Sequence, residues 1–456
     1  MRQTFTVYQR EIHKRDFILI KVALSTLGCK VNQYESAAIL EALDETVFSI
    51  VPFNTKADCY IINTCTVTGR TDYQSRQLIR RAVRTNPEAS IIVTGCYAQI
   101  ASEEIARIPG VTLITGTAEK GNIPHLLRNI AKGEPQSLVD DVSNINEFER
   151  LYTKKLPGHT RAFLKIQDGC DSFCSYCIVP YARGRSRSLQ EGEVINRIKI
   201  FARSGYREIV LTGIHIGIYG HDLTPPSGLL NILKYVEKSK VIERLRLSSI
   251  EMTEISNDMI RIMADSRIIC RHLHIPLQSG DDEILSAMKR NYDSAFFRNR
   301  LKEICQLVPE IAVGIDVMVG FPGEGEEAFN NTLHLIEELP VAYLHVFPYS
   351  DRPGTEASRL PGRVREDERK RRAKILRDLG QKKRNTFAEK FNGKALSVLI
   401  EDKTDKGTGL MRGYSEHYIP VLITNGDLSL ARQIMRVIPD RVLDGKLYGR
   451  TIGNDG

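Results

Sequence analysis

The sequence predicts a multidomain α/β protein with three units in order. A parallel-sheet α/β domain comes first, an open (βα)6 partial TIM barrel follows, and a small OB-like β-barrel ends the chain. Three observations support this. Apolar runs alternate with helix-like stretches, a rhythm typical of parallel sheets. The pattern changes to short β-rich runs after Gly393. The length of 456 residues suits about three domains at ~150 residues each.

Three cysteines follow predicted strands in the first domain, expected at 18–134. The strands are expected at 19–27, 59–63 and 90–94, with helices at 34–43 and 73–83. Cys29, Cys65 and Cys96 each lie just past a strand, and the carboxyl ends of parallel strands share one ligand-binding edge. We therefore expect these thiols to meet. The alternative is three unrelated buried thiols, since free cysteine is common in protein cores.

The middle of the chain predicts the partial barrel. Residues 135–158 mix acids, Ser, Asn and Pro without periodicity and indicate a linker. Strands are then expected at 163–167, 208–213, 244–249, 272–276, 314–319 and 343–348, and helices at 191–202, 228–238, 256–264, 294–307 and 326–338. Six βα units within 159–384 are too few for a closed eight-stranded barrel.

A cysteine-rich loop follows the first barrel strand. Cys170, Cys174 and Cys177 form a C-x3-C-x2-C array. Thiolates favour iron-sulfur clusters or zinc, and closed zinc sites normally take four protein ligands. Three ligands on a four-iron cluster leave one iron for a non-protein ligand, which suits catalysis. The alternative is a zinc site completed by a distant residue.

Polar residues at the ends of barrel strands are candidate cofactor or substrate contacts, because barrel chemistry gathers there. They are Thr212, Gly213, His215, Ser248, Ser249, Glu251, His274, Gln278, Ser279, Asp316, Gly320, Pro322, Tyr349 and Ser350. Loop polarity or helix capping is the alternative for each. Charged residues flank the cysteine loop, where they neutralise a cluster, contact phosphate or face solvent. These are Asp168, Arg183, Arg185 and Arg187.

The last segment, 385–454, predicts a small barrel and a nucleic-acid partner. Strands are expected at 395–400, 409–412, 418–423, 433–437 and 446–451. The preceding run 363–384 carries eleven Lys and Arg against four acids. We expect a basic helix that contacts RNA, with a solvated face as the alternative. Tyr414, Tyr418 and Tyr448 are candidate base-stacking residues.

Composition predicts a cytoplasmic protein with reduced thiols. The nine cysteines are an odd number, and residues 1–16 are polar and charged, without a secretory segment. No apolar run approaches the roughly 20 residues that span a bilayer. The net charge of +8 is mild for this length.

The cysteine loop resembles the radical S-adenosylmethionine (SAM) superfamily, and Tyr176 before the last cysteine fits that pattern. The resemblance implies that the open iron binds the amino and carboxylate groups of SAM. Gly213 stands where that superfamily holds the SAM amino group, although the usual Gly-Gly-Glu is absent. The residues expected to bind the cofactor are Tyr176, Gly213, His215, Ser248, Gln278 and Asp316.

Three runs resemble the amino-terminal domain of the methylthiotransferases: 26–36 (TLGCKVNQYES), 63–65 (NTC) and 94–99 (TGCYAQ). The last segment resembles the TRAM domain of tRNA-modifying enzymes. In the methylthiotransferases the three cysteines hold an auxiliary cluster, so the resemblance implies two [4Fe-4S] clusters. Within the family, 27–32 (LGCKVN) and 247–251 (LSSIE) look most like the MtaB type, which acts on N6-threonylcarbamoyladenosine at position 37 of tRNA.

The resemblance implies that C2–H of this adenine becomes C2–SCH3. Aromatic C2–H is a poor acid without a leaving group, so a radical route is expected. By resemblance, the cluster on Cys170, Cys174 and Cys177 reduces SAM to methionine and a 5′-deoxyadenosyl radical. The cluster on Cys29, Cys65 and Cys96 carries sulfur that a second SAM methylates. Expected partners are the tRNA anticodon stem-loop and an electron donor such as flavodoxin or ferredoxin, with no membrane.

Three other functions remain open at this point. A sister methylthiotransferase for isopentenyladenosine, or for a ribosomal-protein aspartate, would share both clusters. A small-molecule sulfur-insertion enzyme would not need the basic last segment. A non-enzymatic metal-containing RNA-binding protein would not cleave SAM.

Overall fold

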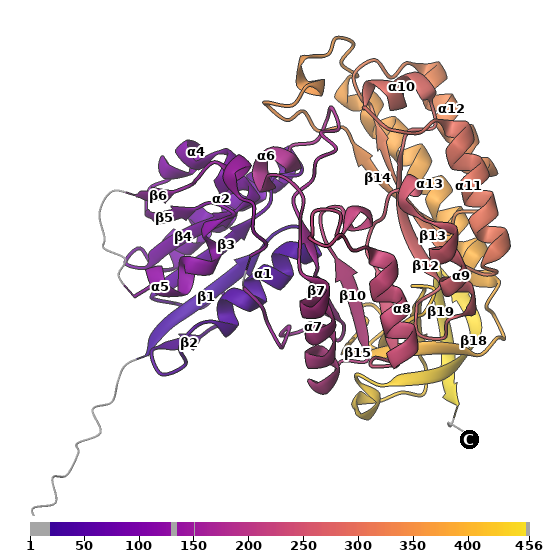
Figure 1. Ribbon diagram of the computed structural model, residues 1–456, viewed down its shortest axis with the longest axis horizontal. Helices are drawn as coiled ribbons and strands as arrows, with labels where there is room; N and C mark the ends of the chain where they lie inside the picture. Colours follow the sequence, from indigo (N-terminus) through magenta and orange to yellow (C-terminus); the bar gives the residue numbers. More distant parts are fainter. Residues whose placement is uncertain (1–18, 129–134, 150, 453–456) are drawn as a thin grey trace, which may run out of the picture.

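The computed structural model describes residues 19–128, 135–149 and 151–452 (Figure 1). The prediction about residues 1–16 lies outside these ranges, as do the expected domain limits at 18, 134 and 454. Within the described ranges, no helix is long and apolar enough to cross a membrane.

The first unit is a six-stranded sheet with the order β2-β1-β3-β4-β5-β6. Every neighbouring pair is parallel. The strands are β1 (Ile20–Thr26), β2 (Phe48–Ile50), β3 (Cys59–Thr64), β4 (Ser90–Gly95), β5 (Val111–Thr115) and β6 (Gln136–Leu138). All residues of β3 are buried, as expected for a central parallel strand covered on both faces. The parallel α/β prediction is confirmed, and β2, β5 and β6 are additions to the three expected strands.

Helices of this unit begin where local chemistry favours them. They are α1 (Lys30–Glu41), α2 (Gly69–Thr85), α3 (Cys96–Ile100), α4 (Ser102–Ala106) and α5 (Ile123–Leu126). Thr68 and Thr71 form a reciprocal capping box at the start of α2. The short helix α3 starts at Cys96. The residue before it, Gly95, is both the last residue of β4 and the N-cap of this helix.

The second unit is the expected open barrel. Its strands are β7 (Ala162–Lys165), β10 (Glu208–Thr212), β11 (Arg244–Leu247), β12 (His272–Gln278), β13 (Ala312–Val319) and β14 (Tyr343–Pro348). They form parallel ladders β11-β10-β7 and β12-β13-β14, joined by bridges such as Ser249 to His274. Within the described ranges β7 and β14 do not pair with each other, so the barrel is open along that side.

Strand alternation separates the two faces of the barrel wall. Val313, Ile315 and Val317 of β13 belong to the main apolar core with residues of the outer helices. Asp316, between them, therefore faces the inside of the barrel. The outer helices include α7 (Glu191–Arg203), α8 (Leu229–Ser239), α9 (Asn257–Asp265), α11 (Ser294–Leu307) and α12 (Glu326–Glu338).

The last unit is a closed five-stranded barrel with the order β15-β16-β17-β19-β18. Its strands are β15 (Leu396–Thr404), β16 (Met411–Ser415), β17 (Pro420–Ile423), β18 (Ile434–Leu443) and β19 (Lys446–Ile452). The expected small barrel is thus confirmed. It packs through an apolar core that includes Phe387 of the preceding helix α13 (Glu366–Glu389).

Helix α13 carries most of the expected basic run, and intramolecular pairs neutralise much of its charge. Arg371 pairs with Glu368 at 2.7 Å and with Glu326 at 2.8 Å. Arg372 pairs with the buried Glu324 at 2.6 Å. The exposed Lys370 and Lys374 pair with acids one turn away. The charge excess in the sequence therefore overstates the positive surface that this helix offers.

The amino-terminal sheet domain contacts both edges of the open barrel. At one edge, Glu35 of α1 pairs with Lys165 of β7 at 2.7 Å. At the other edge, Arg352, shortly after β14, pairs with Asp72 of α2 at 2.6 Å and donates to Thr66 Oγ1 at 2.6 Å. Because β7 and β14 border the lateral opening, this domain spans it, and Figure 1 shows it beside the barrel in indigo and purple.

Candidate active site

The loop with Cys170, Cys174 and Cys177 folds back on itself after β8 (Gln167–Asp168). Gly169 has φ +72°, and a Cβ there would lie 1.8 Å from the Arg185 carbonyl oxygen. Only glycine therefore lets the loop pack against that backbone. Burial, together with the charges of Cys174 and Cys170, raises the pKa of Cys177 to about 12. The three thiols are thus close neighbours, and their soft donor set fits an iron-sulfur cluster.

Two side chains from distant segments direct protons at these sulfurs. His215 Nδ1 lies 3.4 Å from Cys170 Sγ, and its Nε2 lies 2.5 Å from Glu254 Oε1. Burial acts to lower the pKa of His215, but its hydrogen bonds with Cys170 and Glu254 outweigh it and raise that pKa to about 10. Arg290 Nη1 donates to Cys174 Sγ at 3.4 Å. Cationic donors of this kind stabilise thiolates, the form that binds metal.

The structure brings Cys29, Cys65 and Cys96 together at the carboxyl edge of the first sheet. Gly28 and Gly95 both have φ +98°. A Cβ on Gly28 would lie 2.7 Å from Cys65 Cβ, so glycine permits this approach. Burial, and then the charge of Cys96, raises the pKa of Cys65 to about 11, with a smaller contribution from Cys29. The expected meeting of the three thiols is what the structure has, and their role as cluster ligands stays a prediction.

Arg183 joins the two cysteine groups. It ends helix α6 (Val179–Arg183), just after the cysteine loop, and is 1% exposed. Its Nε donates to Cys96 Sγ at 3.3 Å, and its Nη1 donates to Asp168 Oδ1 at 2.9 Å. The same Asp168 oxygen accepts the Gly169 N–H at 2.9 Å. A path of hydrogen bonds therefore runs from Cys96 to the residue beside Cys170.

Arg183 also belongs to a buried ionic network between the two domains. Its Nη1 donates to Glu35 at 2.8 Å, and Lys165 pairs with Glu35 at 2.7 Å and with Asp168 at 2.8 Å. Burial acts to raise the pKa of Asp168, but the charges of Arg183 and Lys165 outweigh it and hold that pKa below its ordinary range. Removing one partner of such a network leaves an uncompensated buried charge.

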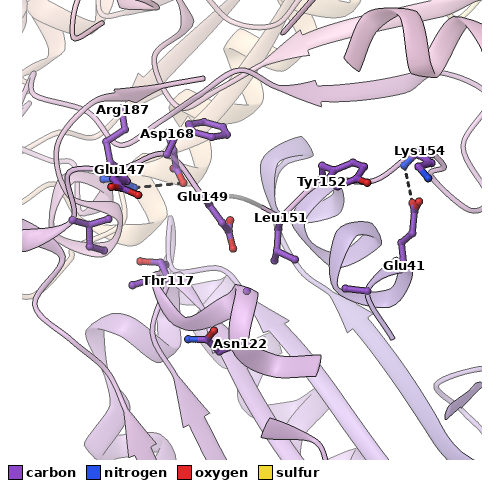
Figure 2. Close-up of a pocket in the computed structure, with 15 residues that line it drawn as sticks. Glu41, Thr117, Asn122, Glu147, Glu149, Leu151, Tyr152, Lys154, Asp168 and Arg187 are labelled. Atoms are coloured by element: carbon purple, nitrogen blue, oxygen red, sulfur yellow. Dashed lines mark hydrogen bonds and ion pairs between the residues drawn. The ribbon is translucent and has the colours of Figure 1, made fainter. Parts of the chain in front are cut away.

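A cavity of about 620 Å³ borders this network. Figure 2 shows Asp168 and Arg187 at one end, 3.7 Å apart as an ion pair, and Lys154 and Glu41 at the other. Arg183 and Arg187 of the expected cationic flank are thus buried and paired with Asp168. Arg185 alone among these arginines is largely exposed, at 71% of its side chain.

Of the other expected cofactor residues, some lie near the cysteine loop and others lie on the strands β12 and β13. Tyr176 lies near Cys174, Cys177 and Arg290, on the cluster loop. A Cβ on Gly213 would lie 2.8 Å from Gln167 Oε1, which accepts the His215 N–H. Ser248 Oγ is buried without a hydrogen-bond partner.

Asp316 and Gln278 lie on the strands β13 and β12. Asp316 accepts from His274 Nε2 at 2.8 Å and lies 3.4 Å from His345 Nδ1. Gln278 has φ +66° beside an irregularity in the pairing of β12 with β13. Contact of any of these residues with SAM stays a prediction.

The expected stacking tyrosines differ in accessibility. Tyr414 and Tyr418 stack at 5.0 Å, with the Arg161 guanidinium over their rings at 4.7 and 5.2 Å. Tyr448 is 6% exposed and Arg441 covers its ring at 4.2 Å. The prediction that Tyr448 offers a stacking face is therefore wrong, because neighbouring atoms already occupy that face.

Several functional contacts carry no local sequence signal. Arg290 lies 116 positions from Cys174, and Arg183 lies 87 positions from Cys96. Arg290 stands outside the cysteine loop and carries no signal in the sequence. Arg183 is among the expected cationic residues beside the loop, but only the fold identifies Cys96 as its partner. Among the cysteines outside the two groups, Cys59 and Cys270 are buried and Cys305 is partly exposed.

Family models match two parts of the chain. The model described as Uncharacterized protein family UPF0004 matches residues 21–116, and that of the radical SAM superfamily matches residues 164–336. The solved radical SAM methyltransferase TsrM from Kitasatospora setae has a TM-score of 0.55 at 14% identity, over 75% of this chain and 77% of that chain. This similarity concerns the fold. The barrel and its cysteine loop thus define a radical SAM protein.

Curated relatives identify the family within that class. Several are named threonylcarbamoyladenosine tRNA methylthiotransferase MtaB, among them the next two. That of Bacillus subtilis is 39% identical over 91% of this chain and 93% of its own length. That of Aquifex aeolicus is 36% identical over 88% and 96%. A tRNA-2-methylthio-N(6)-dimethylallyladenosine synthase of Carboxydothermus hydrogenoformans is 31% identical over 93% and 96%. The chain belongs to the MtaB-type methylthiotransferase family.

Variants with a single cysteine replaced distinguish the roles of the two cysteine groups. Cys174→Ala is expected to lose about half of the bound iron and all reductant-dependent SAM cleavage, because each group is expected to hold one cluster. Cys65→Ala is expected to lose a similar share of iron and to retain SAM cleavage. Iron assays and methionine release on anaerobically reconstituted protein measure both. Cys59→Ala, a buried thiol of β3, is the control and keeps both properties; SAM cleavage by Cys174→Ala would contradict the ligand assignment.

Arg183→Met tests the buried network. The variant removes one buried cation from Glu35 and Asp168, which are then left to share Lys165, so the free energy of unfolding should fall by about 3–5 kcal/mol. Denaturant titration of the purified protein measures the change. Arg185→Met, on the same loop but exposed, should change it by only about 0.5 kcal/mol or less. Equal effects of the two substitutions would show that the network does not hold the domains together.

Proposed function

We propose that the protein converts N6-threonylcarbamoyladenosine at position 37 of tRNA to its 2-methylthio derivative by radical SAM chemistry. The observation that carries this proposal is the convergence of two cysteine triads, from separate domains, on the two ends of the Arg183 hydrogen-bond path. The chain is a radical SAM enzyme, and its cofactors are SAM and [4Fe-4S] clusters. In this proposal the triad of the first domain, Cys29, Cys65 and Cys96, holds a second cluster.

We assign one cluster to Cys170, Cys174 and Cys177, with an open iron for SAM, and the other to Cys29, Cys65 and Cys96. When bound, the clusters and SAM supply the electron, the radical and the methylated sulfur for the exchange at C2. The chain's own side chains hold charge and geometry around them. Arg290 and Arg183 donate hydrogen bonds to the sulfur atoms of Cys174 and Cys96, which orients these proposed ligands.

The amino-terminal domain has a second task in this proposal, which is to exclude water. It spans the opening between β7 and β14 and contacts both edges. A carbon radical or an exposed sulfur would react with solvent species. Covering the opening with the first domain therefore favours transfer of sulfur to the base. We propose Asp316 and His274, which pair on the inner face of the barrel, as contacts for the base or SAM.

The tRNA is proposed to enter by its anticodon stem-loop. The target base stacks within that loop and must turn out of it to reach the inside of a barrel. Tyr414 and Tyr418 are partly exposed with Arg161 over their rings, and Arg185 offers an exposed charge beside the cysteine loop. We further propose that flavodoxin or ferredoxin supplies electrons, and that the reaction takes place in the cytoplasm, where the tRNA is.

The sister methylthiotransferases are the nearest alternative. The relative that acts on dimethylallyladenosine, by its name, covers this chain equally well at a lower identity of 31%. The runs 27–32 and 247–251 favour the threonylcarbamoyl substrate by resemblance.

Nucleoside analysis of tRNA distinguishes these substrates. A strain lacking the gene is expected to lose 2-methylthio-N6-threonylcarbamoyladenosine, accumulate its unthiolated precursor and keep 2-methylthio-isopentenyladenosine where that nucleoside is made. Mass spectrometry of digested bulk tRNA measures all of them, and complementation with the Cys174→Ala variant is the control, because it should not restore the product. Loss of the isopentenyl derivative instead would assign the protein to the sister activity.

A further inference from the structure

A cavity of about 160 Å³ lies where strand β14, helix α13 and the carboxyl-terminal barrel meet. We call it the Arg384 pocket. Its lining residues are Ala342, Tyr343, His345, Arg384, Phe387, Tyr414, His417, Tyr418, Ile419, Pro420 and Gly445. The lining holds aromatic and imidazole rings, one guanidinium and no carboxylate. Its composition thus suits a negatively charged ligand with apolar or planar groups beside the charge.

Arg384 has no anionic partner among the described residues. Its guanidinium lies 5.6 Å from the ring centre of Tyr343, and no carboxylate of those residues pairs with it. Other arginines of α13 differ: Arg371 pairs with Glu326, and Arg372 pairs with Glu324. A half-buried guanidinium without an acid leaves strong hydrogen-bond donors available. The pocket therefore offers N–H donors of Arg384 that an oxyanion can accept.

The turn between β18 and β19 makes room for Arg384. Gly445 has φ +70°, and a Cβ at this position would lie 2.3 Å from Arg384 Cγ. Any other residue there would push the arginine stem away from its place in the pocket. A turn shaped around one long side chain fixes the direction of its guanidinium, which reduces the entropy lost when a ligand binds.

Two tyrosines that line the pocket, Tyr414 and Tyr418, lie next to positively charged side chains. Arg161 lies over the rings of both Tyr414 and Tyr418, and Arg246 lies 4.9 Å from the ring centre of Tyr418. Burial acts to raise the pKa of Tyr418, but the charges of Arg161, Lys30 and Arg246 outweigh it and lower that pKa. Glu208 pairs with Arg246, and Glu401 pairs with Arg161, so these acids offset part of this positive charge.

The pocket borders the proposed reaction space. His345 of its lining lies 3.4 Å from Asp316, which in turn binds His274 inside the barrel. Tyr343 reaches the same group, since its hydroxyl lies 3.2 Å from His274 Nδ1. A nucleotide whose base contacts Asp316 or His274 would therefore have neighbouring atoms at the pocket.

We propose that the Arg384 pocket binds an oxyanion of the tRNA substrate, with the guanidinium of Arg384 as its hydrogen-bonding partner. This inference rests on the proposed function. Two groups of that substrate carry the required chemistry: the carboxylate of the threonylcarbamoyl group and a phosphodiester of the anticodon loop. The planar fork of arginine binds either group through two parallel hydrogen bonds.

The test is equilibrium binding of two RNA hairpins to the full-length, cluster-loaded protein by fluorescence anisotropy. The hairpins have one anticodon stem-loop sequence and carry either threonylcarbamoyladenosine or plain adenosine at position 37. Arg384→Gln removes the charge, and Arg384→Lys keeps it without the fork. Lys382→Gln is the matched control, because it removes one charge from an exposed position of the same helix. Iron content and far-ultraviolet circular dichroism verify that each variant is folded and loaded.

Arg384→Gln should weaken binding about tenfold or more relative to Lys382→Gln, because a charged hydrogen bond is lost. Arg384→Lys should lie between Arg384→Gln and the wild type. Weakening for the modified hairpin alone identifies the carboxylate as the ligand, and equal weakening for both hairpins identifies a phosphodiester. Affinities equal to those of Lys382→Gln for both hairpins overturn the proposal.

A separate measurement keeps this inference distinct from the proposed function. The wild-type protein is incubated with SAM, reductant and the modified hairpin, and the digested RNA is analysed by mass spectrometry. A missing methylthio product, with SAM cleavage intact, refutes the proposed substrate. The Arg384 comparison depends only on binding, so its result stands or falls on its own.

Discussion

One buried guanidinium, that of Arg183, connects the two halves of the candidate active site. It donates to Cys96 of the first domain and to Asp168 beside the cluster loop of the second. Glu35 and Lys165 complete a network that is nearly inaccessible to water. Burying charges is costly, and the cost is offset only when every partner is in place. The network therefore favours one docked arrangement of the domains, in which the cysteine triads occupy fixed relative positions.

The open barrel explains why docking matters. Six βα units leave β7 and β14 unpaired with each other in the part of the chain that the structure describes, so the barrel interior lacks one wall. The first domain supplies that wall through its contacts with Lys165 and Arg352. The carboxyl edge of its parallel sheet, where Cys29, Cys65 and Cys96 lie, thereby faces the inside. Fold topology places this edge next to the loop with Cys170, Cys174 and Cys177, which is the arrangement that our proposal of sulfur transfer requires.

Local sequence patterns predicted the order of the domains and most of their strands. The features that they did not predict depend on contacts between residues far apart in the chain. Strand-end positions of Cys29, Cys65 and Cys96 follow from periodicity, because parallel sheets bring such ends together. The three-residue strands β2 and β6 were missed, since such short runs carry no period. The role of Arg183 depends on partners far away in the chain. The free charge of the basic run of α13 was overstated for a related reason, because acids such as Glu324 and Glu326 come from another segment.

Magnetic interaction between the two clusters tests the central claim most directly, that two cysteine triads hold separate metal centres on the walls of one cavity. The measurement is electron paramagnetic resonance of the fully reduced protein, compared with the summed spectra of Cys65→Ala and Cys174→Ala. Dipolar coupling falls steeply with distance, so facing clusters should give a wild-type spectrum broader than that sum. A wild-type spectrum equal to the sum would contradict the account, because the two centres would then be too far apart to exchange sulfur.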